Sequence, residues 1–368
     1  MSRPLRALAL APYPASAPST RFRLVQLVPL LAELGVDVTV RPFLDEDAYA
    51  RVRGGRRGAA AALAAAVARL PGTLRAVGDH DVVLVQRGVS LALDRWLPSR
   101  LAGRGVPMVY DFDDAVFLPQ EGGRGWLERL RDPEGSTRAF CRGAAVVLAG
   151  NPFLADFARE AVGPDGRDRV RVLPSVVDPR RLVPAGPRPA GALPTLGWVG
   201  SDSTIPYLEA LAPALRALAD AVPHRLLVVA GSRRPRLEGA AFDFARWTPE
   251  GEADLLASLD VGLYPLDDTP WGRGKCGFKA LQYLACGVPC VASPVGVLRD
   301  IVRPGVTGFH ATSTAEWVEA CARLLRDREE RASMGGAGRA LVEASYSVEV
   351  AAPRLAAALH DAVRLHHA

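Results

Sequence analysis

YPLDDTPWGRGKCGFKALQYLACGVPCVAS occupies residues 264–293 and carries the clearest structural signal in the chain. It starts at the end of an apolar strand, crosses a glycine-rich loop, enters a helix expected from about Cys276 and reaches a second apolar strand at Pro289. Gly272, Gly274 and Gly277 let the backbone approach a ligand closely, and the start of a helix offers free N–H groups to phosphate. The stretch predicts a strand–loop–helix–strand unit that binds phosphate at its loop.

Lys275 and Lys279 are the only lysines among the 45 Lys and Arg residues of the chain. Because they are four residues apart, we expect them on one face of the helix start, with Gln282 less than one turn further along. A compact ammonium in a chain that otherwise uses arginine indicates a place where a planar guanidinium would not fit. The pair is predicted to bind one anionic ligand; the alternative is a solvated helix face.

Short apolar runs alternate with helical segments along the whole chain. Strands are expected at residues 5–10, 36–40, 82–85, 106–110, 144–148, 170–173, 196–199, 226–229, 261–264 and 289–292, and helices at 22–34, 59–70, 206–221, 250–259, 314–326, 328–344 and 348–366. Continuous apolar strands separated by helices indicate parallel sheets covered on both faces. Residues 178–194 have the composition of a linker. The sequence therefore predicts an α/β protein with two doubly wound, Rossmann-like domains that face each other across a cleft.

The composition excludes several classes of protein. At 368 residues the chain exceeds one ordinary core. Its apolar runs are shorter than the roughly 20 residues that span a bilayer, and its start is not an ordinary signal peptide, so we expect a cytoplasmic protein. The five cysteines lack zinc spacing and are expected to be small buried residues. No GxGxxG follows a strand and no GxxxxGK[ST] occurs, which removes the dehydrogenase and P-loop signatures.

The loop after the first strand reads APYPASAPSTRFR, residues 11–23, and places two arginines in the first turn of the next helix. Cations at a helix start are electrostatically unfavourable. We therefore expect Arg21 or Arg23 to face an anion across the cleft, with pyrophosphate as the candidate; the alternative is a pair of exposed helix arginines.

Three acidic residues follow the strand at 106–110, in the stretch DFDD. They lie at the carboxyl end of a predicted strand, where ligand-facing residues concentrate. Asp113 and Asp114 are candidates for binding an acceptor hydroxyl or for a perturbed pKa. Helix capping and turn formation are the alternative, and a DxD metal site ranks last.

Other candidates follow the strands of the second domain, namely Gly200, Ser201, Arg233 and Trp247. They are expected to line the same edge of the cleft. Trp247 is a candidate for stacking on a base, and core packing is the alternative.

The block at 264–293 resembles the donor-binding motif of the family 4 glycosyltransferases, retaining enzymes of the GT-B fold, and the resemblance covers nearly the whole chain. Similar features are the opening strand, loop and helix, together with NPFL at 151–154, LPSVVD at 173–178, GWVGS at 197–201, ACGVP at 285–289 and GVTG at 305–308. The chain departs from the family where two motif glutamates would stand: Gly274 and Gln282 occupy those positions. Gln282 can still bond a ribose hydroxyl, whereas Gly274 supplies no acid. The usual glycine-rich loop after the first strand is also absent.

The resemblance implies transfer of a sugar from a nucleotide diphosphate sugar to a hydroxyl of a glycan, lipid-linked or small-molecule acceptor, with retention and without a metal or other cofactor. Lys275 and Lys279 would neutralise the leaving diphosphate. The candidate donor-binding residues are Gly274, Gly277, Phe278 and Gln282 of this block, together with Gly200, Ser201, Arg233 and Trp247 at the strand ends. It further implies an acceptor-side domain over residues 1–185, a donor-binding domain over 192–346, and a helix over 348–368 that packs back on the first domain.

Two other functions compatible with the sequence are a nucleotide-sugar epimerase of the same fold and a nucleotide-sugar-binding protein that lost catalysis with the two glutamates. The net charge of +5 suits anionic partners. We expect no nucleic-acid partner, and the basic segment from Arg51 to Arg57 is a candidate for peripheral contact with an anionic membrane, with a solvated face as the alternative. The base, the sugar, the acceptor and the oligomeric state stay open.

Overall fold

The computed structural model describes residues 3–53, 56–88, 94, 96–119, 132–186, 189 and 191–367. The chain forms two compact units, Met1–Ser175 with Val348–Ala368 (unit 1) and Val176–Ser347 (unit 2). The division precedes the linker expected at 178–194, because the N–H of Val177 donates to the carbonyl of Tyr346 at 3.0 Å and Leu182 is buried in the core of unit 2.

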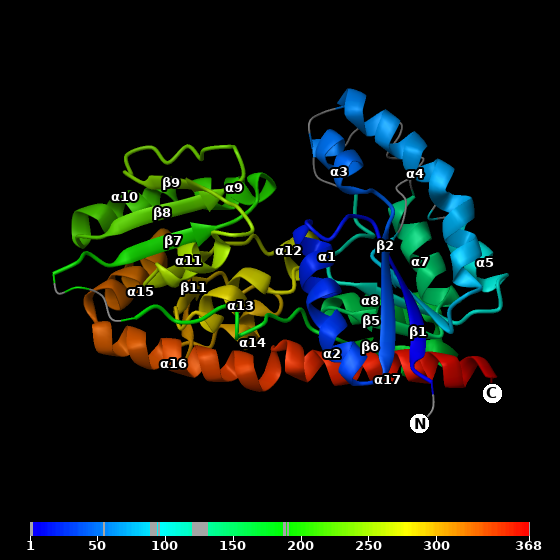
Figure 1. Ribbon diagram of the computed structural model, residues 1–368. Helices are drawn as coiled ribbons and strands as arrows, with labels where there is room; N and C mark the ends of the chain where they lie inside the picture. Colours follow the sequence, from blue (N-terminus) through cyan, green and yellow to red (C-terminus); the bar gives the residue numbers. More distant parts are fainter. Residues whose placement is uncertain are drawn as a thin grey trace. The chain divides into compact units, whose positions relative to one another are not determined.

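Unit 1 contains a parallel six-stranded sheet in the order β2-β1-β3-β4-β5-β6 (Figure 1). The strands are β1 (Leu5–Ala11), β2 (Val36–Pro42), β3 (Val82–Gln86), β4 (Met108–Phe112), β5 (Val146–Ala149) and β6 (Val170–Val172). The apolar runs of β3, β4 and β5 are buried throughout, whereas β2 alternates between buried and exposed positions at one edge. Burial on both faces explains why the inner strands read as continuous hydrophobic runs.

Helices cover this sheet, and the last of them comes from the end of the chain. They are α1 (Pro18–Arg23), the 3-10 turn η1 (Val25–Leu27), α2 (Val28–Glu33), α3 (Glu46–Arg53), α4 (Arg56–Val77), α5 (Leu97–Ala102), α7 (Pro133–Gly143), α8 (Pro152–Val162), η2 (Pro164–Arg169) and α17 (Val348–His367). Helix α17 contacts β3, β4 and β5 and buries an apolar face that includes Leu355 and Leu359. It is therefore part of the core of unit 1.

Unit 2 repeats the architecture with a parallel sheet in the order β12-β11-β10-β7-β8-β9. Its strands are β7 (Thr195–Val199), β8 (Arg225–Ala230), β9 (Asp243–Arg246), β10 (Val261–Tyr264), β11 (Cys290–Ala292) and β12 (Gly308–His310). Its helices are η3 (Asp202–Thr204), α9 (Ile205–Glu209), α10 (Ala212–Ala221), α11 (Glu252–Ala257), α12 (Pro270–Arg273), α13 (Phe278–Ala285), α14 (Leu298–Ile301), α15 (Thr314–Arg326) and α16 (Arg328–Ser345). Two parallel sheets with helices confirm the predicted fold class.

Two helices expected to be continuous are divided, so those predictions are wrong in detail. The segment 22–34 holds the end of α1 followed by η1 and α2, and the segment 206–221 holds most of α9 followed by α10. Pro29 and Pro213 lie in the first turns of α2 and α10, where a residue without an N–H can start a helix but cannot continue the one before it. The edge strands β9 and β12 were not predicted.

All five cysteines are buried, as expected from their apolar neighbours, and none forms a disulfide bond within the described residues. Burial raises the pKa of Cys286 to about 12, so its thiolate is scarce at neutral pH. Within the described residues, no helix combines the length and the apolar character needed to cross a membrane. The side chains from residue 52 to residue 57 lie outside the described part, so the basic segment proposed for membrane contact stays a prediction.

Candidate functional site

The motif loop of unit 2 is built from two short helices with a left-handed residue between them. Thr269 caps α12 by accepting a hydrogen bond from the N–H of Gly272, and Gly277, with φ of 68°, precedes α13. A Cβ at Gly277 would lie 2.4 Å from Cδ1 of Ile301. Glycine is required there by both backbone conformation and space.

This break corrects the expected placement of the two lysines. Helix α13 begins at Phe278, so Lys279 lies in its first turn, whereas Lys275 precedes the helix and donates its N–H to the carbonyl of Gly272 at 3.1 Å. Gly274 follows α12 and donates its N–H to the carbonyl of Pro270 at 3.0 Å. The lysines therefore do not share one helix face.

The two lysine side chains also differ in their surroundings. The half-buried Lys275 places Nζ 4.5 Å from the ring centroid of Trp271, a cation–π contact. The Nζ of Lys279 donates to Oε1 of Gln282 at 2.8 Å and lies 3.7 Å from Oε1 of Glu252 in α11. Glu252, only 6% exposed, also accepts a hydrogen bond from Nε1 of Trp247 at 3.0 Å.

Gln282 is the fully buried member of this network. Because Lys279 can only donate, it fixes Oε1 as the amide atom that faces it and turns Nε2 the other way. Nε2 is buried and has no hydrogen-bond partner within the described residues. A buried donor without a partner costs about 1–3 kcal/mol, so this atom points to a ligand that accepts a hydrogen bond.

The remaining candidates of unit 2 are engaged in holding the ends of its strands. A Cβ at Gly200 would lie 2.3 Å from the ring of Trp198, and Ser201 forms a capping box with Thr204. The guanidinium of Arg233 binds Glu209 at 3.1 Å. Trp247 is half-buried and packs against the apolar core, which agrees with the alternative of core packing. Its indole N–H donates a hydrogen bond to Glu252.

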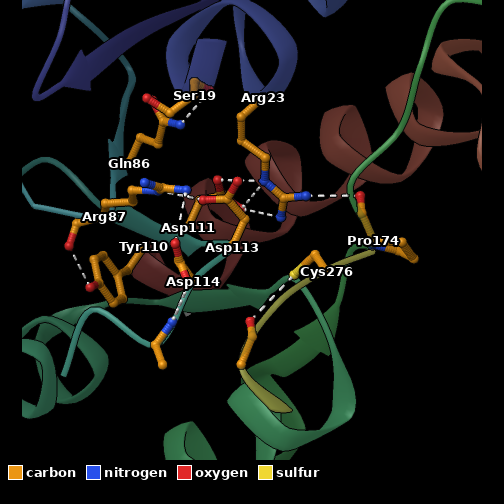
Figure 2. Close-up of polar contacts among 12 residues, drawn as sticks. Ser19, Arg23, Gln86, Arg87, Tyr110, Asp111, Asp113, Asp114, Pro174 and Cys276 are labelled. Atoms are coloured by element: carbon orange, nitrogen blue, oxygen red, sulfur yellow. Dashed lines mark hydrogen bonds and ion pairs between the residues drawn. The ribbon is translucent and has the colours of Figure 1, made fainter. Parts of the chain in front are cut away.

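In unit 1, Arg23 forms a buried ion pair instead of facing an anion in solution (Figure 2). Its Nε and Nη2 donate to Asp111 at 2.8 and 2.6 Å, and its Nη1 donates to the carbonyl of Pro174 at 2.8 Å. The side chains of Arg23 and Asp111 are 4% and 3% exposed. Burial raises the pKa of Asp111, and Arg23 acts against that rise. Arg23 is thus a structural residue, and the pyrophosphate role expected for it is not supported.

Both arginines lie in the last turn of α1, which begins at Pro18, so their expected placement at a helix start is wrong and their charge is favourable there. Arg21 places its guanidinium 4.2 Å from the ring centroid of Phe22. A role toward phosphate or acceptor stays a prediction for Arg21.

Asp113 and Asp114 are paired with Arg87 at the carboxyl end of β4. Nε of Arg87 lies 2.6 Å from Oδ1 of Asp113, and its Nη2 lies 3.8 Å from Oδ2 of Asp114. Burial opposes ionisation of Asp113, but Arg87 and Arg23 outweigh it and hold the pKa of Asp113 below its usual value. The two carboxylates keep 13% and 15% of their side-chain surface exposed. Both carboxylates can therefore contact a ligand, and the lowered pKa of Asp113 keeps that group an anion.

Sequence reasoning missed Glu252 and Arg87, the two residues that organise these networks. Arg87 comes directly after β3, and the signal was available, because residues at the carboxyl end of a parallel strand face the ligand edge. Glu252 carried no comparable signal, because its partner Lys279 belongs to another helix.

The comparisons with known proteins agree with this architecture. Residues 194–327 match the family model described as glycosyl transferases group 1. A GDP-mannose-dependent phosphatidylinositol monomannoside mannosyltransferase of Corynebacterium glutamicum is 30% identical over 208 residues, covering 50% of this chain and 54% of that protein. A D-inositol 3-phosphate glycosyltransferase of Thermobispora bispora is 34% identical over 289 residues, or 78% of this chain and 52% of that protein. The chain thus spans about half the length of the curated relatives it matches.

Solved structures match over nearly the full chain. Sucrose-phosphate synthase of Thermosynechococcus elongatus superposes with a TM-score of 0.68 at 18% identity, covering 95% of this chain and 97% of that one. HepE of Anabaena, in complex with UDP and glucose, gives a TM-score of 0.67 at 16% identity, with 97% and 99% covered. Together with the match of unit 2, these results confirm the predicted GT-B fold and the resemblance to family 4 glycosyltransferases, and the match to glycosyl transferases group 1 lies in unit 2.

Proposed function

We propose that the protein transfers a sugar from a nucleotide diphosphate sugar to a hydroxyl acceptor, with retention at the anomeric carbon. The observation that carries the proposal is the buried Nε2 of Gln282, which lacks a partner within the described residues and lies in the domain that matches glycosyl transferases group 1. An amide donor at that point suits a ribose hydroxyl of the donor nucleotide. Related proteins are named for GDP-mannose, and a solved structure of similar fold holds UDP, so the base stays open.

The reaction breaks the bond from the anomeric carbon to the diphosphate oxygen and forms a bond from that carbon to the acceptor oxygen. The proton of the acceptor hydroxyl leaves with the nucleoside diphosphate. Negative charge grows on the leaving diphosphate. Lys275 is the cation we assign to that charge, because Lys279 is held by Glu252 and Gln282. Asp113 and Asp114 of unit 1 are assigned to the acceptor hydroxyl.

The first experiment is a transfer assay with UDP, GDP, ADP and TDP sugars, with donor binding followed by thermal shift. Transfer to an added acceptor supports the proposal. A free epimer of the sugar formed without acceptor would identify an epimerase instead. Stabilisation by a donor with neither transfer nor donor hydrolysis would identify a binding protein that lacks catalysis.

Lys275→Ala should lower kcat/KM for the donor on the order of 100-fold, because one fixed charge at the leaving group is removed. The melting temperature should change little, since Lys275 is only half-buried and a cation–π contact such as that with Trp271 contributes about 0.5–1 kcal/mol. Initial rates and a thermal melt measure both effects. Arg273→Ala is the matched control, because Arg273 is an exposed cation two residues away that pairs with Asp268. Equal kinetics for Lys275→Ala and the unmodified chain would remove Lys275 from the site.

We expect a metal chelator to leave transfer unchanged, because Lys275 and the start of α13 supply positive charge for the diphosphate. Rates are compared with and without EDTA, and then after adding Mn²⁺. Activity that falls with EDTA and returns with Mn²⁺ would instead make Asp113 and Asp114 metal ligands.

A further inference from the structure

Arg87 has an unusual backbone conformation. Its φ is 61°, in the left-handed region, and the next N–H, that of Gly88, donates to the carbonyl of Gln86 at 2.6 Å. A long side chain is disfavoured in this region, which glycine and asparagine adopt more readily. Such strain persists only where the surrounding fold imposes it, and it concentrates at functional sites.

Two hydrogen bonds from β4 impose the conformation. The N–H of Arg87 donates to the carbonyl of Asp111 at 2.6 Å. The carbonyl of Arg87 accepts a hydrogen bond from the Tyr110 hydroxyl at 2.7 Å (Figure 2). Tyr110 is fully buried and stacks on Phe112 and Phe140 with centroids 5.3 and 4.9 Å apart. A rigid aromatic core therefore fixes the backbone of Arg87.

The conformation directs the guanidinium of Arg87 toward the two carboxylates that follow β4. It lies 2.6 Å from Asp113 and 3.8 Å from Asp114, and all three side chains keep some exposed surface. The neighbouring pair of Arg23 and Asp111 is closed to solvent. The two ion pairs thus differ: one belongs to the core, and the other is open to a ligand.

The residue before Arg87 also points to a hydroxyl ligand at this edge. Gln86 is fully buried, and its Nε2 donates to the carbonyl of Ser19 at 2.8 Å. Its Oε1 is buried and has no hydrogen-bond partner in the described part of the chain. This oxygen can accept a hydrogen bond, and the hydroxyl of a ligand is a group that could donate it.

We propose that Arg87 is a positioning residue of the acceptor side, held in a left-handed conformation so that it fixes Asp113 and Asp114 to receive an acceptor hydroxyl. The proposal rests on the proposed function. Arg87 does not touch the reacting atoms; it sets the place and the charge of the carboxylates that do. The charged and titratable groups around Asp113 are Arg23 from α1, Arg87 after β3, Asp111 in β4 and the adjacent Asp114, with Tyr13 near Arg87.

The test variant is Arg87→Asn, because asparagine tolerates the left-handed backbone and carries no cation. We expect kcat/KM for the acceptor to fall on the order of 10- to 100-fold while the donor KM and donor hydrolysis without acceptor stay unchanged. Loss of the guanidinium raises the pKa of Asp113, so the acid limb of the pH–rate profile should move to higher pH. Arg87→Gly relieves the backbone strain and should show the same kinetic loss.

The control is Arg138→Asn, which removes an arginine of the same unit that pairs with Glu134 and Glu160 on helices α7 and α8. It should change neither the acceptor kinetics nor the acid limb. A melting temperature lowered by Arg87→Asn with unchanged acceptor kinetics would make Arg87 purely structural, and equal losses toward donor and acceptor would also overturn the proposal.

One readout does not depend on activity. A carbon-13 NMR titration of the Asp113 carboxyl should give a higher pKa in Arg87→Asn than in the unmodified chain, and an unchanged pKa would contradict the proposed control of Asp113 by Arg87. If the unmodified chain transfers no sugar from any donor, the proposed function fails, and the NMR titration still decides whether Arg87 sets the state of Asp113.

Discussion

A chain that ends at Tyr346 is expected not to fold unit 1, because α17 completes the core of that unit. Helix α17 contacts three strands of the sheet, and Leu355 and Leu359 on its inner face are 2% and 0% exposed. Burial of each leucine contributes roughly 1.5–3 kcal/mol, and several alanines add to this. The sum is a large part of the roughly 5–15 kcal/mol that stabilises a typical domain.

Circular dichroism and chemical denaturation measure this effect on the truncated chain. A graded version compares two leucines of the same helix: Leu359→Ala should cost about 2–5 kcal/mol of unfolding free energy, whereas Leu365→Ala should cost under about 0.5 kcal/mol. Leu365 is 53% exposed, so the same substitution removes little buried surface there. Equal effects of the two variants, or a truncated chain with an intact unit 1, would show that α17 is not part of this core.

The elements that the sequence predicts well are those whose signal is local. The inner strands β3, β4 and β5 are short, largely apolar runs, because they are buried on both faces of the sheet. Strand β9 was missed because its sequence, DFAR, is polar at both ends and lies at an edge of the sheet. The divided helices depend on Pro29 and Pro213, which can lie in a first turn or end a helix, and only packing decides which.

The site residues were likewise predictable where their signal was local and not where it depended on distant partners. The motif loop was recognisable from its glycines and lysines, because those residues are consecutive in the chain. The partners of its side chains were not, since Glu252 reaches Lys279 from another helix. Arg23 was assigned to a ligand for the same reason: the partner that neutralises it, Asp111, is 88 residues away. The expected placement was also wrong, because α1 begins at Pro18 and Arg21 and Arg23 lie in its last turn, where a cation is favourable. The anion that pairs with Arg23 belongs to the protein itself.

Breaking this buried pair should destabilise the protein strongly. Arg23→Ala leaves the Asp111 carboxylate buried without its cation, and the loss of one partner of a buried ion pair costs about 3–5 kcal/mol. Arg3→Ala is the matched control, since Arg3 forms a 2.7 Å ion pair with Asp81 in the same unit but is 67% exposed. An exposed pair of this kind is worth about 0–1 kcal/mol. Urea denaturation of the two variants measures the difference.

The pH dependence gives this prediction a second, independent check. Burial raises the pKa of Asp111, and removal of Arg23 takes away the charge that opposes the rise. In Arg23→Ala, Asp111 therefore has a higher pKa in the folded state than in the unfolded chain. The loss of unfolding free energy caused by the substitution is fully present only above that raised pKa. As the pH falls through it, the carboxyl becomes neutral and the destabilisation relative to the unmodified chain should shrink. Replacing both partners by apolar residues, Arg23→Met with Asp111→Leu, should recover most of the lost stability because no buried charge is left alone. A loss that is the same at neutral and acidic pH, and that the double variant does not recover, would mean that Arg23 stabilises unit 1 by packing and not through its charge.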